Sequence, residues 1–459
     1  MSDHEPHVRI LTNGVVVPSW KDPDVVGDGA VAWSGDRILA TGTAAEVRAR
    51  YPAAEPVDAC GGMIIPGLIN LHHHLYSAFA RGLAPAPPPP RDFGQILDRL
   101  WWRLDRVLTP ETVRLSALLG AVESIRWGCT TIFDHHASPS CLRGSLGIVG
   151  RTLEEAGLSG VLCYEISDRN GHDEAIAGLV ENIRFIERYR DHPRLRGTLG
   201  LHASFTLTDE TLDEAANRRP PNCGCHIHLA EDPLDFQASE MAFGAAPLER
   251  LERRGLLDDR ALLVHGVHLT SEGRKTVARN NSILIHCPES NANNGVGRLD
   301  VELAAADGCT VALGTDGMSA AMLRSLRFAF LAHRAGREDP TSGFTAHPLL
   351  LQNNVEAARR FFDEELLGEL APGAPADICV VDCPPPTPVN RENFFGHLVY
   401  GASDSPVRHT VARGEFLLEN FRHTTLDPQA IADIARTEAP GLWERFHALG
   451  DSPVDWLPI

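Results

Sequence analysis

A pair of histidines at the end of an apolar run is the first sign of chemistry in this 459-residue chain. The run 66–71 leads directly into His72 and His74, which are two positions apart. Side chains alternate between the two faces of a strand, so both imidazoles leave the same face and can bind one metal ion. Histidine pairs also have structural roles, so the weight of this one depends on the residues further along the chain.

Three later apolar runs also end in metal-binding or acid–base side chains. They end at His228, His265 and Asp316, and Glu231 lies three residues after His228. A (β/α)8 barrel gathers the carboxyl ends of its parallel strands at one face, where its chemistry takes place. Three imidazoles and one carboxylate suit a divalent ion, with one position left open for water. We expect one such ion, Zn²⁺ first and Fe²⁺ as the alternative, with the ligands His72, His74, His228 and Asp316.

The remaining polar groups near these strand ends have catalytic roles in this interpretation. A divalent metal lowers the pKa of its bound water toward about 7 and so supplies a nucleophile at neutral pH. Glu231 can reach back toward that water as a proton shuttle. His265 can hydrogen-bond the water or the developing oxyanion. Asp316 is counted as catalytic as well as metal-binding, because it is the other carboxylate able to carry the proton.

The elements that must position these groups follow an alternating strand and helix pattern. Apolar strand ends separated by amphipathic stretches recur at intervals of roughly 20 to 40 residues, as in βα units. The first interval is longer, and it contains the proline-rich stretch 84–90 and the helix-like stretch 93–104. We expect this segment to cover the barrel mouth, with a passive surface loop as the alternative. Eight strand ends are predicted, near His74, Asp134, Glu165, His202, His228, His265, His286 and Asp316.

Both ends of the chain have all-β patterning. Short alternating runs at 8–12 and 30–33 are matched near the other end by 376–382 and 407–416, with a turn at Arg413 and Gly414. The predicted fold class is therefore α/β, a (β/α)8 TIM-type barrel with a small β-sandwich formed from both chain ends. The expected boundaries are 1–64 and 368–425 for the sandwich, 65–367 for the barrel and 426–459 for a C-terminal helical extension.

Composition narrows the partners and the location. The formal net charge of −19 disfavours nucleic acid, because phosphate binding needs clustered basic side chains. No run of about 18 apolar residues and no signal-like start at 1–6 is present, so we expect a cytoplasmic protein without a membrane partner. Ten scattered cysteines fit reduced thiols, and a structural zinc site at Cys223 and Cys225 is disfavoured because no second cysteine pair accompanies them. A small heterocyclic substrate and a homo-oligomer are expected.

These motifs resemble the amidohydrolase superfamily, in its cytosine deaminase, guanine deaminase and chlorohydrolase branch, over nearly the whole chain. The resemblance implies one metal held by the same four ligands, with Glu231 and His265 from the fifth and sixth strands as the proton-transfer pair. Other members bridge two metals through a carboxylated lysine on the fourth strand. The strand end here is 200–204, and the chain has only two lysines, Lys21 and Lys275. A mononuclear site is the consequence.

Three shorter motifs, 101–106, 134–139 and 290–294, are similar to SsnA-type aminohydrolases. The histidine triple 72–74 followed by Tyr76 and Arg81 is similar to 8-oxoguanine deaminases, which implies an oxidised purine-like ring. The predicted set of substrate contacts is Tyr76, Arg81, Trp101, His202, Arg169 and Asn291. At the strand ends, Asp134, His135, His136, Glu165 and Asp168 have a structural role or a substrate contact as equal alternatives.

The leading hypothesis for function is hydrolytic deamination of a small N-heterocycle of the purine, pterin or triazine kind. An activated water would attack a ring carbon that carries an amine, and Glu231 would move a proton to a ring nitrogen. Ring opening of a cyclic amide or ureide by the same water is the alternative, and a chlorohydrolase is a more distant one. From a different class, an inactive barrel serving as a binding subunit is also compatible with the fold.

Overall fold

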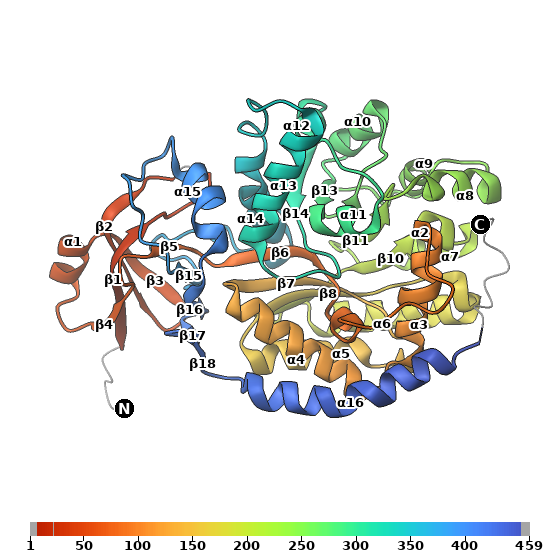
Figure 1. Cartoon of the computed structure of the whole chain (residues 1–459), viewed down its shortest axis with the longest axis horizontal. Coiled ribbons are helices and arrows are strands. Elements are labelled where there is room, and N and C mark those ends of the chain that lie inside the picture. Colours follow the sequence, from red (N-terminus) through yellow and green to blue (C-terminus); the bar gives the residue numbers. More distant parts are fainter. Residues whose placement is uncertain (1–6, 22, 451–459) are drawn as a thin grey trace.

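The computed structural model describes residues 7–21 and 23–450. Residues 1–6, where we expected no targeting segment, lie outside the described residues, as do residue 22 and residues 451–459. Figure 1 shows a β-rich part made from both ends of the chain beside a larger barrel, with the long C-terminal helix α16 (Pro428–Ala448) running along the barrel. Among the described helices, none is long and apolar enough to cross a membrane.

The terminal β-part is one nine-stranded sheet. Strand β5 (Met63–Pro66) pairs parallel with β1 (Val8–Val16) and antiparallel with β15 (Ile378–Val381), so the two chain ends join there. Buried apolar side chains such as Leu11, Trp33 and Ile378 form its own core. The other strands are β2 (Val26–Ser34), β3 (Arg37–Thr43), β4 (Glu55–Asp58), β16 (Val407–Ala412), β17 (Glu415–Glu419) and β18 (Arg422–His423).

Gly67 joins this sheet to the barrel at a tight place. A Cβ at this position would lie 2.5–2.6 Å from the Thr130 side chain, so only glycine fits between the two strands. The barrel strands that come next are all parallel: β6 (Leu68–His73), β7 (Cys129–His136), β8 (Ser159–Tyr164), β9 (Leu195–Gly197), β10 (Leu199–Ala203), β11 (Cys225–Leu229), β12 (Leu262–His265), β13 (Ile283–His286) and β14 (Thr310–Leu313).

These segments make eight barrel strands, as the sequence predicts. Strands β9 and β10 are separated only by Thr198, and they pair with β8 and β11 respectively, so they are one interrupted strand. Single bridges between Ile166 and Leu201 and between His73 and Asp316 join the two sheets edge to edge. All eight strand ends therefore meet at one face, where a (β/α)8 fold places its active site.

The seam between the first and last strands is reinforced from helix α14 (Leu350–Phe362). The buried Asn354 amide donates to the carbonyls of Ile69 at 2.7 Å and Leu313 at 2.9 Å, and it accepts from the Leu313 N–H at 2.7 Å. One side chain thus satisfies three backbone groups of β6 and β14. His72 lies in β6, and His74 and Asp316 follow the ends of β6 and β14, so Asn354 helps to set the spacing of these predicted metal ligands.

Helices surround the barrel and cover its strands (Figure 1). The helix α4 (Pro110–Arg126) shows how the sequence starts such elements: Thr109 caps it in a reciprocal pair with Thr112, and Pro110 occupies the first turn. The others are α5 (Ser145–Ala156), α6 (His172–Arg188), α7 (Asp209–Arg218), α8 (Pro233–Phe243), α9 (Pro247–Glu252), α10 (Ser271–Arg279), α11 (Pro288–Asn294), α12 (Val301–Ala306) and α13 (Met322–Arg337), with α1 (Ala44–Arg50) and α15 (Phe394–Tyr400) beside the terminal sheet.

The long segment after β6 folds over the barrel mouth, as predicted. It contains α2 (Phe93–Ile96), a π-helical turn at Leu97–Trp101 and α3 (Trp102–Leu104). The buried Arg103 guanidinium donates to the carbonyls of Phe446, Leu449 and Gly450, at the end of the helix expected within 426–459. A cation at a helix C-terminus is electrostatically favourable, so α16 fastens this covering segment to the barrel.

Candidate metal centre and active site

Four predicted ligands come together at the barrel mouth. The candidate ligand atoms of His72, His74, His228 and Asp316 all lie within 4.8 Å of one another. Asp316 Oδ1 is 2.9 Å from His74 Nε2 and 3.5 Å from His72 Nε2. His74 Nε2 is 3.2 Å from His228 Nε2. The strand ends of β6 and β11 and the loop after β14 thus present three imidazoles and one carboxylate to one point.

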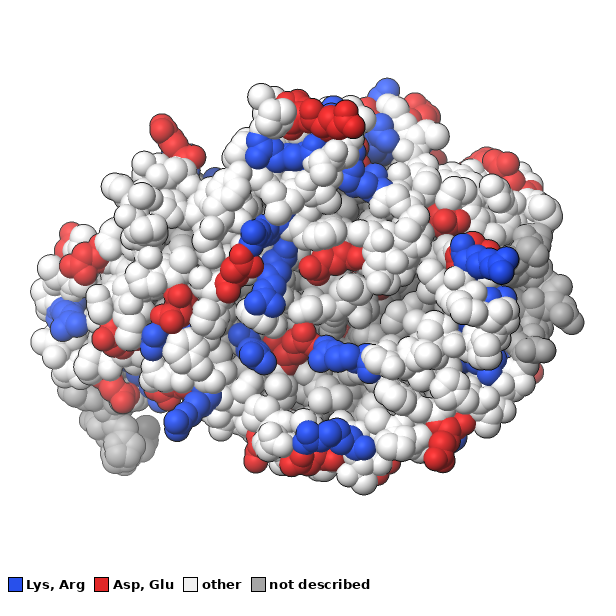
Figure 2. All heavy atoms as spheres, viewed as in Figure 1, with Lys and Arg blue, Asp and Glu red and all other residues white. Residues whose placement is uncertain are grey.

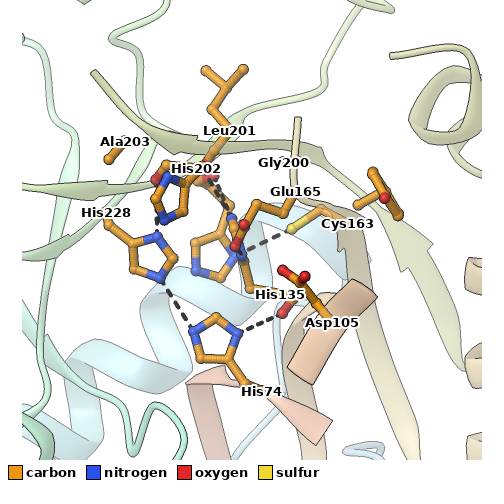
Figure 3. A network of polar contacts seen from close by, with 12 residues as sticks. His74, Asp105, His135, Cys163, Glu165, Gly200, Leu201, His202, Ala203 and His228 are labelled. Atoms are coloured by element: carbon orange, nitrogen blue, oxygen red, sulfur yellow. Dashed lines mark hydrogen bonds and ion pairs between the residues drawn. The ribbon is translucent and has the colours of Figure 1, made fainter. Parts of the chain in front are cut away.

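The outer nitrogen of each imidazole is fixed by a neighbouring group. His74 Nδ1 donates to the His135 carbonyl at 2.6 Å, and His228 Nδ1 donates to the His202 carbonyl at 2.9 Å. His72 Nδ1 lies 2.8 Å from His226 Nε2. These contacts orient the three rings so that the Nε2 atoms face inward, as in protein metal sites where a second partner fixes each histidine. Figure 3 shows this arrangement around His74 and His228.

These residues fit a divalent metal ion. A carbonyl can only accept, so His74 and His228 each carry a proton on Nδ1, and their Nε2 atoms face each other. Although His74 is buried, the Asp316 carboxylate raises the pKa of His74 to about 9, so positive charge is favoured beside this carboxylate. His72 Nε2 is buried without a hydrogen-bond partner. Burial and the neighbouring His135 hold the pKa of His228 well below its usual range, which keeps the ring in the neutral form that binds metal. Converging lone pairs beside a carboxylate require a cation for stability.

The backbone at this face adopts conformations that non-glycine residues rarely take. The φ angles are 57° at Asp316 and 76° at His265. Such angles cost free energy and persist only where surrounding structure enforces them. Asp316 is held by its N–H bond to the His72 carbonyl at 3.0 Å and by Ser290 Oγ, which lies 2.5 Å from Oδ2. The strain therefore aims a carboxylate and an imidazole into the site.

A second group of acid–base residues lies beside the ligands. Glu231 Oε2 is 3.3 Å from His265 Nε2, and Asp316 Oδ2 is 3.9 Å from the same nitrogen. His265 Nδ1 lies 2.8 Å from Asn291 Oδ1, which can only accept, so the ring proton is on Nδ1 and Nε2 is an acceptor. Burial and the nearby Asp316 carboxylate raise the pKa of Glu231 well above its ordinary value. Glu231 is thus suited to hold a proton that it can pass on.

A pocket that is open to solvent lies above this cluster. Of the predicted substrate contacts, Tyr76, Trp101 and His202 line it. Aromatic side chains form part of the wall, and polar or charged side chains form much of the rest. Further lining residues that the sequence reasoning did not single out as contacts are Phe93, Leu97, Trp102, Phe205, Asp232, Asp235, Ser290, Asn293, Asn294 and Met318.

Three predicted substrate contacts lie elsewhere. The Arg81 side chain is 78% exposed and pairs with Glu123 at 2.9 Å, because the 3-10 turn after β6 directs it away from the barrel mouth. Arg169 is buried behind the pocket wall, where it pairs with Asp105. Asn291 is directed at His265 and not at the pocket. For Arg81, Arg169 and Asn291, the structure therefore gives structural or positioning contacts in place of the predicted lining.

Among the other strand-end candidates, some hold the local structure and one lines the pocket. Asp134 Oδ1 accepts from the Leu75 N–H at 2.7 Å, and Asp168 accepts from Thr208 N and Thr211 Oγ1, so both hold loops. His136 contacts Ser138 at 2.8 Å. Glu165 differs, because it lines the pocket.

Some of the pocket residues missed by sequence reasoning lie in segments that the sequence had already marked. The 93–104 stretch was expected over the mouth, and the 290–294 motif was noted, but neither shows from sequence which of its side chains turn inward.

The fold and this site define a class of protein: a (β/α)8 hydrolase with a divalent metal centre. Residues 63–417 match the amidohydrolase family, and residues 29–54 match an imidazolonepropionase-like composite domain of bacteria. The chain belongs to the amidohydrolase family. It is an enzyme of the kind that acts on non-peptide C–N bonds, and members of this family use a divalent metal.

Relatives of known activity cover nearly the whole chain. A 5-methylthioadenosine/S-adenosylhomocysteine deaminase of Nitratidesulfovibrio vulgaris is 31% identical over 416 residues, 89% of this chain and 91% of that protein. The corresponding deaminase of Moorella thermoacetica is 30% identical over 414 residues, 89% of this chain and 94% of that protein. The predicted family and its deaminase and chlorohydrolase branch are thereby confirmed.

Solved structures confirm the predicted fold. An adenosine deaminase from Xanthomonas campestris with bound zinc superposes with a TM-score of 0.82, at 23% identity, over 97% of this chain and all of that one. The E. coli guanine deaminase superposes with a TM-score of 0.77, at 18% identity, over 90% of this chain and all of that one.

Proposed function

We propose that this enzyme hydrolytically deaminates a small N-heterocycle that carries an exocyclic amine. The observation that carries the proposal is the placement of Glu231, with its raised pKa, between His265 and the metal ligand Asp316 at the floor of an aromatic pocket. Such a carboxyl is suited to take a proton from water and give it to a ring nitrogen. The activities of the relatives named above support the same reaction class.

The proposed metal is Zn²⁺, held by His72, His74, His228 and Asp316. When bound there, it would lower the pKa of a water molecule and supply a nucleophile. Zinc suits this set of imidazole and carboxylate ligands, and it is the ion bound in the Xanthomonas campestris structure. Metal analysis of the purified enzyme tests this assignment, with about one equivalent of zinc per chain as the expected result.

The residues of the chain carry the proton transfers. Glu231 takes the proton of the attacking water and delivers it to a ring nitrogen, while His265 Nε2 accepts a hydrogen bond that orients the water. The new C–O bond forms at the carbon that bears the amine. Glu231 then takes the remaining proton from the new hydroxyl and passes it to that amine, so the C–N bond breaks, ammonia leaves and a carbonyl remains. The aromatic wall excludes bulk water from these steps.

Ring opening of a cyclic amide or ureide is the second candidate, because it needs the same nucleophile and the same proton carrier. A chlorohydrolase and an inactive binding subunit are more distant, and the intact ligand and proton-transfer set disfavours the latter. Assays with aminated purines, pterins, triazines and cyclic ureides distinguish the candidates. Ammonia release with retention of the ring supports deamination, whereas ring-opened product without ammonia contradicts it.

Two further expectations belong to the proposal. All ten cysteines are free, which supports a reducing cytoplasmic location. The partner is a small molecule, and we expect a homo-oligomer, which light scattering of the purified protein tests. Acidic and basic side chains are interspersed on the face drawn in Figure 2, which does not favour binding to nucleic acid.

A further inference from the structure

Glu165, at the end of β8, is a buried pocket carboxylate whose partners are incomplete. Its side chain is 4% exposed and lines the pocket. Its two ion-pair contacts are long: His135 Nδ1 lies 3.4 Å from Oε2, and Arg169 Nη2 lies 3.8 Å from Oε1. Within the described part of the chain, no donor lies at an ordinary hydrogen-bond distance of 2.7–3.2 Å from either oxygen. A buried carboxylate normally accepts several such bonds, so this one has capacity for donors from a ligand.

Neighbouring groups keep this carboxylate ionised. Burial alone would raise its pKa, but the contact with His135 and the charge of Arg169 bring the pKa of Glu165 below its ordinary range. Arg169 is itself anchored by Asp105 and lies over the Trp102 ring, at 5.6 Å from the centroid. Glu165 therefore faces the pocket as an acceptor only.

His202 presents a second acceptor in the same pocket. Thr206 Oγ1 donates to the Ala203 carbonyl at 3.0 Å, so it must accept the 2.7 Å bond from His202 Nδ1. The proton of the neutral ring is therefore on Nδ1, and Nε2 has a free lone pair. Figure 3 shows Glu165, His202 and His228 in one cluster.

The two acceptors lie close to the reacting centre. Ligand-type atoms of Glu165, His135 and His228 are within 4.8 Å of one another, which places the Glu165 carboxylate beside a metal ligand. A second metal at this place is disfavoured, because it would need His228 Nε2, which already faces His74 Nε2 at the first proposed metal position. A substrate ring held over the metal ligands would therefore turn an edge toward Glu165.

We propose that Glu165 determines substrate specificity together with His202, by accepting hydrogen bonds from ring N–H groups of the substrate. This inference rests on the proposed deamination. This pair of acceptors selects an uncharged planar lactam, which is a ring with N–H beside C=O, that also carries the exocyclic amine. An adenine-type ring edge offers lone pairs to these acceptors and is disfavoured. No Lys or Arg is among the described lining residues, so a phosphorylated substrate lacks a partner.

Glu165→Gln tests this assignment, with guanine as a probe that has ring N–H groups and adenosine as a probe whose ring has none. The wild-type enzyme is expected to favour guanine in kcat/KM. The variant should lose about tenfold to a hundredfold with guanine, mostly through KM, and less than twofold with adenosine, since a hydrogen bond to a charged acceptor is replaced by a neutral one. Metal content should not change.

Two companion variants separate recognition from structure. Thr206→Val removes the acceptor that fixes the His202 tautomer, and we expect a threefold to tenfold loss confined to guanine. Glu174→Gln is the matched control: it lies on α6 outside the pocket and bonds to Asn170, so both probes should react as in wild type. Equal losses of Glu165→Gln on both probes, or a wild-type preference for adenosine, would overturn the proposal.

A binding measurement keeps this test independent of the proposed reaction. Hypoxanthine has the lactam N–H but no amine to lose, so its affinity by calorimetry reports recognition alone. Weaker binding by tenfold or more in Glu165→Gln supports the inference even where no probe is deaminated, a result that would count against the proposed function only. Unchanged hypoxanthine affinity in the variant contradicts the role of Glu165.

Discussion

His74 and His228 face each other through Nε2 atoms only 3.2 Å apart, although each ring carries its proton on the opposite nitrogen. Two lone pairs at this distance repel unless a cation lies between them. The backbone carbonyls of His135 and His202 fix these tautomers. His135 belongs to β7, which lies next to β6, and His202 belongs to β10, which lies next to β11. The fold therefore fixes which nitrogen, Nε2, each of these two rings turns toward the proposed metal position.

His228→Ala should lose metal and activity together. The substitution removes one of the four proposed ligands, so metal affinity should fall at least a hundredfold. Metal content after gel filtration and turnover with added metal measure the two effects. His397→Ala, on α15 away from the barrel mouth, is the control and should match wild type in both. A His228→Ala enzyme with full metal and normal turnover is incompatible with the site.

The ligand set could be predicted because it depends on strand ends, which an apolar run followed by a polar residue marks directly. Parallel strands bring those ends to one face whatever the helices do, so His72, His74, His228 and Asp316 meet as expected. The eight strands and the terminal sheet could be predicted from the same period-two and turn patterns.

The pocket wall could not be predicted in the same way. Which asparagine of the motif 290–294 enters the pocket depends on the rotation of the short helix α11, and Asn291 turned to His265 while Asn293 and Asn294 line the cavity. Arg169 depends on Asp105, a partner 64 positions away in the sequence. Long-range pairing of this kind has no local signature in a single sequence.

Asn354→Ala should destabilise the enzyme at the seam between β6 and β14. It leaves three buried backbone groups without their partner, a loss of about 2–4 kcal/mol in unfolding free energy. Asn353→Ala is the matched neighbour, since Asn353 is partly buried and bonds to only one carbonyl, that of Val311. The thermal unfolding midpoints of the two metal-loaded variants, measured at one scan rate, test this prediction. The midpoint of Asn354→Ala should be clearly lower than that of Asn353→Ala. Equal midpoints for the two variants would show that the seam does not depend on Asn354.

His265→Asn should keep the metal and lower kcat by about a hundredfold, because the orienting hydrogen bond to the attacking water is lost. Asn291→Ala should act in the same direction but more weakly, about tenfold, since it frees the His265 ring without removing it. Metal analysis and steady-state kinetics of both variants provide the measurements. Metal loss as the main effect of His265→Asn would instead make His265 a ligand.

Glu231→Gln separates proton transfer from metal binding. Glutamine keeps the size of the side chain and can still interact with Asn294, which donates to Glu231 Oε1 at 3.1 Å, but it cannot carry a proton between water and substrate. Metal occupancy should therefore stay near wild type while kcat falls by about 10² to 10⁴. Glu240→Gln, on the exposed side of the next helix, α8, should leave both quantities unchanged.

The same variant decides between the two carboxylates at the floor of the pocket. Asp316 is held by Ser290 and lies against two ligand imidazoles, so its lone pairs are committed to the metal centre. Glu231 contacts His265 and Asn294, and its raised pKa lets it hold the proton that it takes from water until that proton is delivered to substrate. If Glu231→Gln turned over a verified substrate at the wild-type rate, Asp316 would have to carry the proton instead. That result would refute the mechanism proposed here.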